Sequence, residues 1–172
     1  MGDAAERSST HISLGDAAEQ LLDLTVAVDA HAGERLTSDP VIWLGTVAPD
    51  GRPHTVPVWF AFDDPIVTIF SRPDTAKIGH LRTHGAVSVA LDTLGHGADV
   101  VTGGGHAVLA ELAHVEDALD AFGRKYAQML GDQPLDAWLM TFSQPIVVTL
   151  DRLVAWRSTA DGLEYRSLPS RG

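Results

Sequence analysis

The sequence that decides the fold reads VIWLGTVAPDGRPHTVPVWFAF (residues 41–62) and continues as DDPIVTIFSRPDTAKIGHLRTHGAVSVAL (residues 63–91). Two apolar runs flank Pro49-Asp50-Gly51, a turn in which proline presets φ and glycine takes the positive φ of a tight hairpin. A third apolar run, residues 66–71, leads into a basic segment with a helical pattern, and a fourth run follows. Strands in this order are joined by turns, which predicts an antiparallel sheet.

The second strand, residues 53–62, carries side chains that alternate between two faces. One face holds Val56, Val58, Phe60 and Phe62, and the other holds Thr55, Pro57, Trp59 and Ala61. Because proline cannot donate a hydrogen bond to a ladder, Pro57 predicts an edge strand or a bulge. After the third strand, Asp74 or Thr75 is expected to cap a helix of about two turns, which His84-Gly85 ends.

The rest of the chain completes a fold that is mostly β with helices (α+β). Before the first strand we expect a helix from Asp16 through Val26, a turn at Arg35-Leu36-Thr37 and a helix stop at Asp39-Pro40. Later strands are expected over 87–91 and 99–112, and the second of these is broken by Gly103-Gly104-Gly105. Helices are expected over 115–130 and from Pro134 to Leu139, and strands over 146–156 and near 163–166. Hairpin order without βαβ alternation predicts a six- to seven-stranded antiparallel barrel with helices at its rims.

Composition and charge exclude several classes of function. The chain has 172 residues, which suits one domain, here residues 15–168, and the polar residues 1–14 are expected to form a disordered tail. The absence of cysteine excludes disulfides, thiolate nucleophiles and cysteine-ligated metals. A net charge of −11 disfavours nucleic acid and anionic membranes as partners. With no apolar run long enough for a signal peptide or a membrane span, we expect a cytoplasmic protein.

Several motifs together resemble a known family, the pyridoxamine-phosphate-oxidase-like split β-barrel oxidoreductases, and more narrowly its actinobacterial branch that uses the deazaflavin coenzyme F420 in place of FMN. The similarity rests on WLGTV (residues 43–47), PDGRP (49–53), VPVWF (56–60), SRPDTAK (71–77) and DVV (99–101), and extends over about residues 36–157. It implies an FMN-binding-like split barrel and a homodimer with two cofactor sites at the subunit interface. The chain departs from the family at His80, where asparagine is common, and at Gly104-Gly105-His106, which replaces a Glu-Gly-Thr-like triplet.

A phosphate site is predicted at the turn after the third strand. Residues 72–84 carry Arg72, Lys77 and Arg82 against Asp74, a local charge of +2 in an acidic chain. A helix N-terminus offers free N–H donors and a partial positive charge, both of which suit a phosphate. The alternative interpretation is a solvated surface helix with an aspartate cap. The resemblance favours the phosphate site and implies cofactor contacts from Val56, Pro57, Val58, Trp59, Phe70, Ser71, Arg72, Thr75, Lys77 and His80.

Other chemistries find less support in the sequence. Plain barrel core is the alternative for the second strand, and it is preferred for Val58 and Phe60 taken alone. His80 and His84 have the spacing of metal ligands on a helix, but without a nearby carboxylate or cysteine they are interpreted as surface histidines, so no metal site is expected. The Gly95 region does not form a dinucleotide-binding fingerprint, because Val100 stands where the third glycine belongs. No Ser-His-Asp set stands out, and no catalytic acid or base is assigned.

Three functions therefore remain open. The first is an F420-dependent reductase that passes a hydride from reduced deazaflavin to an unidentified organic small-molecule acceptor. Deazaflavin transfers electrons in pairs and reacts poorly with oxygen, which favours a reductase over an oxidase. The second is an FMN-binding oxidoreductase of the same fold. The third is a non-catalytic protein that binds flavin, deazaflavin or a tetrapyrrole.

Overall fold

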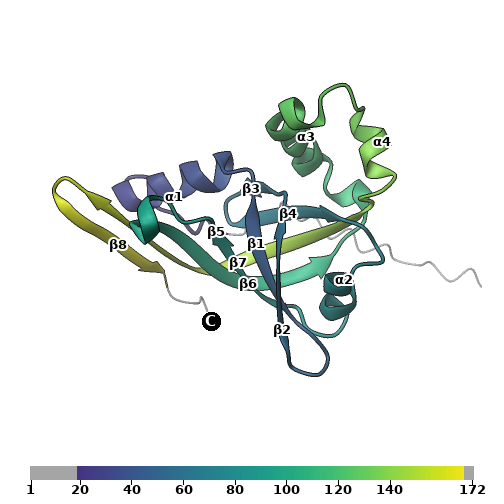
Figure 1. Cartoon of the computed structure of the whole chain (residues 1–172), viewed down its shortest axis with the longest axis horizontal. Helices are drawn as coiled ribbons and strands as arrows, with labels where there is room; N and C mark the ends of the chain where they lie inside the picture. The colour runs from purple at the N-terminus through teal and green to yellow at the C-terminus, as the bar shows by residue number, and fades with distance from the viewer. Residues whose placement is uncertain (1–18, 169–172) are drawn as a thin grey trace, which may run out of the picture.

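A computed structural model describes residues 19–168, which form one antiparallel sheet with helices at its margins (Figure 1). The strands are β1 (Ile42–Val47), β2 (Pro53–Val58), β3 (Ala61–Asp63), β4 (Ile66–Ser71), β5 (Ala86–Leu91), β6 (Asp99–Leu109), β7 (Gln144–Thr159) and β8 (Gly162–Leu168). The α-helices are α1 (Ala27–Ser38), α2 (Ala76–Leu81), α3 (Glu116–Leu130) and α4 (Leu135–Leu139), and 3₁₀ turns lie at η1 (Gly95–Gly97) and η2 (Leu112–His114). The predicted fold class, antiparallel and mostly β with helices at the rims, is confirmed.

The strand order explains why the sheet curls. The order is β2-β1-β5-β6-β7-β4-β3, with β8 paired to β7 off this path. The two ends of that order, β2 and β3, are consecutive in the chain and are separated only by Trp59 and Phe60. Since two residues must span from one edge of the sheet to the other, the sheet rolls into a split barrel whose edges meet at Trp59-Phe60. The predicted single strand over 53–62 is thus broken in two, and Pro57 lies on an edge strand as expected.

Two separate apolar clusters hold the fold together. The larger fills the barrel with fully buried side chains such as Ile42, Leu44 and Ile69. The smaller is aromatic, lies between α3, α4 and the sheet, and includes Phe122 and Tyr126. The barrel cluster follows from strand alternation, whereas the aromatic cluster follows from the apolar stripe on α3.

The chain before β1 differs from the sequence-based expectation. The predicted helix through Leu21 and Leu22 is wrong over its described part, and Asp16 lies outside the described residues. The backbone N–H groups of Leu21 and Leu22 donate to the Asp64 carboxylate at 3.1 and 2.9 Å, and both side chains are buried. This tertiary contact overrides the helical spacing. The helix, α1, begins instead at Ala27.

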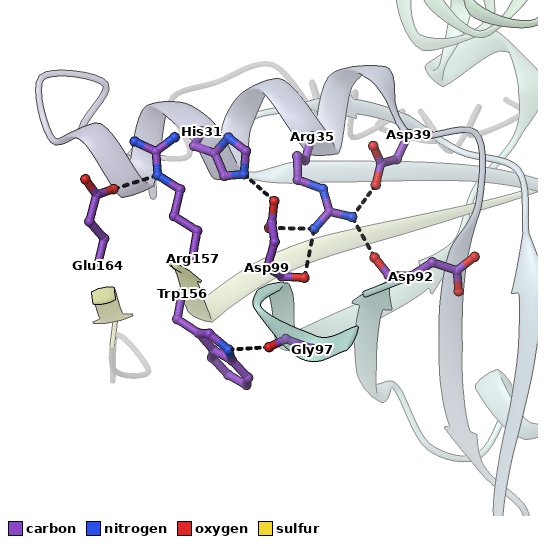
Figure 2. Close-up of polar contacts among 9 residues, drawn as sticks. All are labelled: His31, Arg35, Asp39, Asp92, Gly97, Asp99, Trp156, Arg157 and Glu164. Atoms are coloured by element: carbon purple, nitrogen blue, oxygen red, sulfur yellow. Dashed lines mark hydrogen bonds and ion pairs between the residues drawn. The ribbon is translucent and has the colours of Figure 1, made fainter. Parts of the chain in front are cut away.

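The predicted turn at Arg35-Leu36-Thr37 is also wrong, because these residues belong to the last turn and a half of α1. The buried Arg35 guanidinium donates to Asp99 Oδ1 at 2.8 Å, to Asp39 Oδ2 at 2.6 Å and to the Asp92 carbonyl at 2.6 Å (Figure 2). His31, one turn earlier, meets Asp99 Oδ2 at 2.8 Å. These contacts tie α1 to the loop between β5 and β6. The predicted stop at Asp39-Pro40 is confirmed.

Other boundaries shift for local reasons. The glycine break in β6 is confirmed as a register shift between Gly104 and Gly105, where a Cβ on Gly105 would lie 2.0 Å from the Thr149 carbonyl oxygen. β6 ends at Leu109, before the predicted Leu112, and α2 ends at Leu81, before His84-Gly85. No helix within residues 19–168 is long and apolar enough to cross a membrane.

Candidate functional site

A pocket of about 390 Å³ opens where the β2–β3 junction, the β4–α2 turn and α4 meet. Eight of the ten residues predicted to contact a cofactor line it: Pro57, Val58, Trp59, Phe70, Ser71, Arg72, Thr75 and Lys77. Val41, Trp138 and Phe142 complete the lining. The volume lies near the lower end of the range for ligand sites, about 300–1,000 Å³.

One end of the pocket is polar and is built by the turn after β4. Ser71 is buried, and its hydroxyl donates to the Arg72 carbonyl at 3.0 Å and lies 3.2 Å from the Thr75 hydroxyl. Thr75 precedes α2 as its N-cap but forms no side-chain cap bond, and its hydroxyl donates to the same carbonyl at 3.2 Å. Two hydroxyls therefore gather at one point beside the pocket, where they can turn toward an anion.

Lys77 supplies the charge at this end. Burial lowers the pKa of its ammonium, and no carboxylate of residues 19–168 lies within ion-pairing distance of it. Arg72, by contrast, is paired with Asp74 at 3.0 Å and is more than half exposed. Because α2 has only six residues, its dipole adds little, and the anion site predicted from a helix N-terminus depends chiefly on Lys77.

The other end of the pocket is aromatic. The Trp59 ring stacks on Tyr126 with centroids 4.5 Å apart and planes 2° apart, and lies nearly parallel to Trp138 at 6.4 Å. Trp138 stacks in turn on Phe142 at 4.4 Å. Among the described residues, no side chain that lines this end is ionisable; the ionisable lining residues are Arg72 and Lys77, at the polar end. The arrangement offers flat apolar surfaces to a planar ligand.

Tyr126 fixes the position of the aromatic end. Its hydroxyl accepts a hydrogen bond from the Phe60 N–H at 2.9 Å and donates to the Pro40 carbonyl at 2.8 Å. Burial raises the pKa of Tyr126 to about 12. The hydroxyl thus holds the β2–β3 junction and the entry to β1, the two backbone segments next to Trp59 and Val41.

Two predicted cofactor residues do not line the pocket. Val56 pairs with Leu44 of β1, deeper in the sheet. His80 turns toward β1, where its Nδ1 lies 3.0 Å from the Thr46 hydroxyl and its ring meets His54 edge-on at 5.2 Å. Cofactor contact by these residues stays a prediction that this geometry does not favour. Among residues 19–168, no group of three or more His, Cys, Asp or Glu side chains is placed to hold a metal ion.

Sequence reasoning missed three lining residues, Val41, Trp138 and Phe142. Trp138 and Phe142 belong to α4 and the segment after it, and only the fold brings them to the β2–β3 junction. The signal that could have found them is the run of aromatic residues from Phe122 to Phe142, which extends past α3 and gathers in one cluster.

Comparison with known proteins identifies the family. The sequence pattern described as pyridoxamine 5'-phosphate oxidase matches residues 28–147 of the 172. The chain belongs to the pyridoxamine 5'-phosphate oxidase family. The match runs from α1 into the first residues of β7 and therefore includes every residue of the pocket. No curated protein matches the chain.

Solved structures show the same fold at low identity. A conserved hypothetical protein of Mycobacterium tuberculosis, Rv2991, is 18% identical with a TM-score of 0.65, over 82% of this chain and 88% of that one. The heme storage protein HutZ of Vibrio cholerae is 13% identical, with a TM-score of 0.58 over 73% and 90% of the two chains. An FAD-binding protein of Mesorhizobium loti is 22% identical, with a TM-score of 0.56 over 73% and 91%.

The pocket fits a phosphorylated flavin-type group. Lys77 is a desolvated cation that has no carboxylate partner among residues 19–168, the Ser71 and Thr75 hydroxyls line the same end, and parallel aromatic rings form the opposite wall. Such a donor set matches a ligand with an anionic end and a planar apolar end.

Proposed function

We propose that the protein is an oxidoreductase that binds a flavin-type cofactor in this pocket, with F420 as the cofactor and an organic small molecule as the acceptor. The observation that carries the proposal is the division of one pocket into a cationic, hydroxyl-lined end and an aromatic end. Lys77, Thr75 and Ser71 would hold the phosphate, and Trp59 and Trp138 would form the wall against which the ring packs.

The residues present determine which role the cofactor has and which role the protein has. A bound deazaflavin supplies the hydride chemistry, while the protein binds and orients it. The aromatic end holds no ionisable side chain, so it would exclude water from the ring and offers no acid or base of its own. This fits a transfer of a hydride that needs no protein proton donor, and it favours electron-poor, largely apolar acceptors.

We further propose that two copies of the chain form a homodimer that completes the site. The pocket is near the lower limit for a ligand site, and Pro57 and Arg72, which line it, are exposed. A cofactor held here would extend past these residues, where a second copy can cover it. A measured mass of one chain at micromolar concentration in the presence of cofactor would contradict this assembly.

FMN is the second candidate cofactor. The structural similarity to an FAD-binding protein supports a flavin in this fold, and the pocket's donor set suits an FMN phosphate equally well. The family resemblance of the SRPDTAK and VPVWF segments puts F420 first. A tetrapyrrole, the ligand suggested by the similarity to a heme storage protein, fits this pocket less well, because none of the lining residues within 19–168 is a histidine, tyrosine, cysteine or methionine that could ligate an iron.

The test is a titration of the purified protein with oxidised F420, followed by the fluorescence of F420, with FMN in parallel. We expect micromolar or tighter binding of F420 and weaker binding of FMN. Reduced F420 is then offered with quinones, nitroaromatics and tetrapyrroles, and oxidation of the cofactor is followed. Tight binding without turnover would make the protein a carrier, the reverse preference would assign FMN, and binding of neither would overturn the proposal.

A further inference from the structure

Lys125 on α3 has an ammonium group that is buried without a polar partner in the described part of the chain. Its Nζ lies over two aromatic faces, 3.6 Å from the ring centroid of Phe60 and 5.6 Å from that of Tyr126. A cation is attracted to ring faces, but this attraction replaces only part of the hydration lost on burial.

A packing role alone does not explain this placement. A lysine on an amphipathic helix normally covers apolar surface with its stem and keeps its ammonium in water. The neighbouring Arg124 is exposed, as expected for α3. Lys125 instead turns inward and keeps an unpaired charge among aromatic rings, which costs stability.

Within the part of the chain that the structure describes, no carboxylate forms an ion pair with Lys125. The carboxylate whose field reaches Lys125 is that of Asp39, and its Oδ2 is already bound to Arg35 at 2.6 Å. Burial lowers the pKa of Lys125 to about 8, with Asp39 opposing the shift, so the ammonium stays mostly charged at neutral pH. The interior behind α3 therefore carries a net positive charge.

That charge lies behind the aromatic wall of the pocket. Phe60 follows Trp59 in the chain, and Tyr126, which follows Lys125, stacks on Trp59 with centroids 4.5 Å apart. The Tyr126 ring thus has the ammonium 5.6 Å from its centroid and is also in direct stacking contact with the pocket residue Trp59. Because the ammonium and the rings of Phe60 and Tyr126 are buried, the field of the ammonium is weakly screened and reaches the aromatic end of the pocket.

We propose that Lys125 is a specificity-determining residue that selects ligands whose planar ring carries a delocalised negative charge. This inference rests on the proposed function and deepens it. The hydroxylated ring of a deazaflavin is an acidic phenol whose anion spreads over the ring system, whereas the flavin ring of FMN lacks this group. The buried ammonium would favour the deazaflavin anion over the neutral flavin, although the phosphate end of the pocket treats both alike.

The other charges near the pocket do not duplicate this effect. Lys77 and Arg72 lie at the opposite, polar end, where a phosphate would occupy Lys77 and Asp74 already pairs with Arg72. On the α1 side, Arg35 and Asp39 offset one another. Within residues 19–168, Lys125 is therefore the charge near the aromatic end that no ion pair balances.

The experiment is an absorbance titration of protein-bound F420 between about pH 5 and 7, where Lys125, with its pKa of about 8, stays mostly charged. The phenol and phenolate forms of the chromophore absorb differently, so the titration reports the pKa of the bound ring. The variants are Lys125→Met, which removes the charge at similar volume, Lys125→Arg, which keeps it, and Arg124→Met, which removes the adjacent exposed charge. Lys125→Gln is the second neutral variant if the methionine does not fold.

We expect the wild type, Lys125→Arg and Arg124→Met to lower the pKa of the bound phenol, and Lys125→Met to raise it by about one unit relative to them, a tenfold change in preference for the anion. An equal phenol pKa in Lys125→Met and Arg124→Met, with F420 bound to both, would overturn the inference and leave the proposed function standing. Failure of the wild type to bind F420 would overturn both.

Discussion

The two ends of the pocket are made from the chain in opposite ways. The polar end comes from one continuous segment, residues 71–77, which follows β4 and lies largely at the surface. The aromatic end joins the β2–β3 junction to Trp138 and Phe142, and it shares rings with the smaller apolar cluster under α3. The difference teaches that substitutions at the polar end can alter ligand binding without altering stability, whereas substitutions at the aromatic end alter both.

The largest expected effect is the loss of stability on removing Trp138. This side chain is only 8% exposed and contacts Trp59, Phe70, Phe122 and Phe142, so Trp138→Ala should lower the free energy of unfolding by about 3–5 kcal/mol. Urea denaturation measures it. The control is Trp43→Ala, because Trp43 is 38% exposed on the sheet; its cost should be about 1 kcal/mol. Similar losses in the two variants would contradict the claim that the aromatic end belongs to the core that stabilises the fold.

At the polar end, Lys77→Ala should weaken F420 binding by about 10- to 100-fold, since a charge-assisted hydrogen bond contributes about 1.5–3 kcal/mol. The melting temperature should stay within error of the wild type or rise slightly, because Lys77 is desolvated and unpaired in the free protein. The matched control is Arg82→Ala, which removes an exposed charge just after the same helix and outside the pocket. Equal affinities of the two variants would place the phosphate elsewhere.

Tyr126→Phe tests whether the Tyr126 hydroxyl holds the β2–β3 junction in place at the aromatic end. It keeps the ring stack on Trp59 but leaves the buried Phe60 N–H without its acceptor, so stability should fall by roughly 1–3 kcal/mol. F420 affinity should fall by less than about tenfold. Tyr165→Phe, at a 60% exposed position on β8, is the control and should change neither quantity. No loss in Tyr126→Phe would show that packing alone holds the junction.

The smallest effect is a pH dependence of stability from Lys125. Its pKa is lowered from 10.5 to about 8 in the folded chain, so between these values the unfolded state binds the extra proton and stability rises with pH. The penalty for burying the charge is fully present below about pH 8 and is relieved toward pH 10. Lys125→Met should therefore melt a few degrees above the wild type at pH 7, with the gap narrowing by pH 9.5. A gap that is constant with pH would contradict the buried charge.

The contrast between the two ends also explains what could be read from the sequence. Turn residues such as Pro49-Asp50-Gly51 and strand alternation act locally, so the order of the strands and the polar end were predictable. The helix expected over Leu21 and Leu22 failed because the distant Asp64 carboxylate binds their N–H groups, which no local pattern records. At the aromatic end Trp59 was predicted, but Trp138 and Phe142 were missed for the same reason, since Trp138 reaches Trp59 only through the packing of α3 and α4.

The central claim is that Lys77 recognises the phosphate of a ligand whose ring packs against the wall formed by Trp59 and Trp138. Its most direct test is a binding cycle: wild type and Lys77→Ala, each titrated with F420 and with the deazaflavin chromophore that lacks the phosphate-bearing side chain. The account predicts that the wild type prefers F420 by at least about tenfold, that Lys77→Ala loses most of this preference, and that both bind the bare chromophore alike. An undiminished preference for F420 in Lys77→Ala would contradict the account.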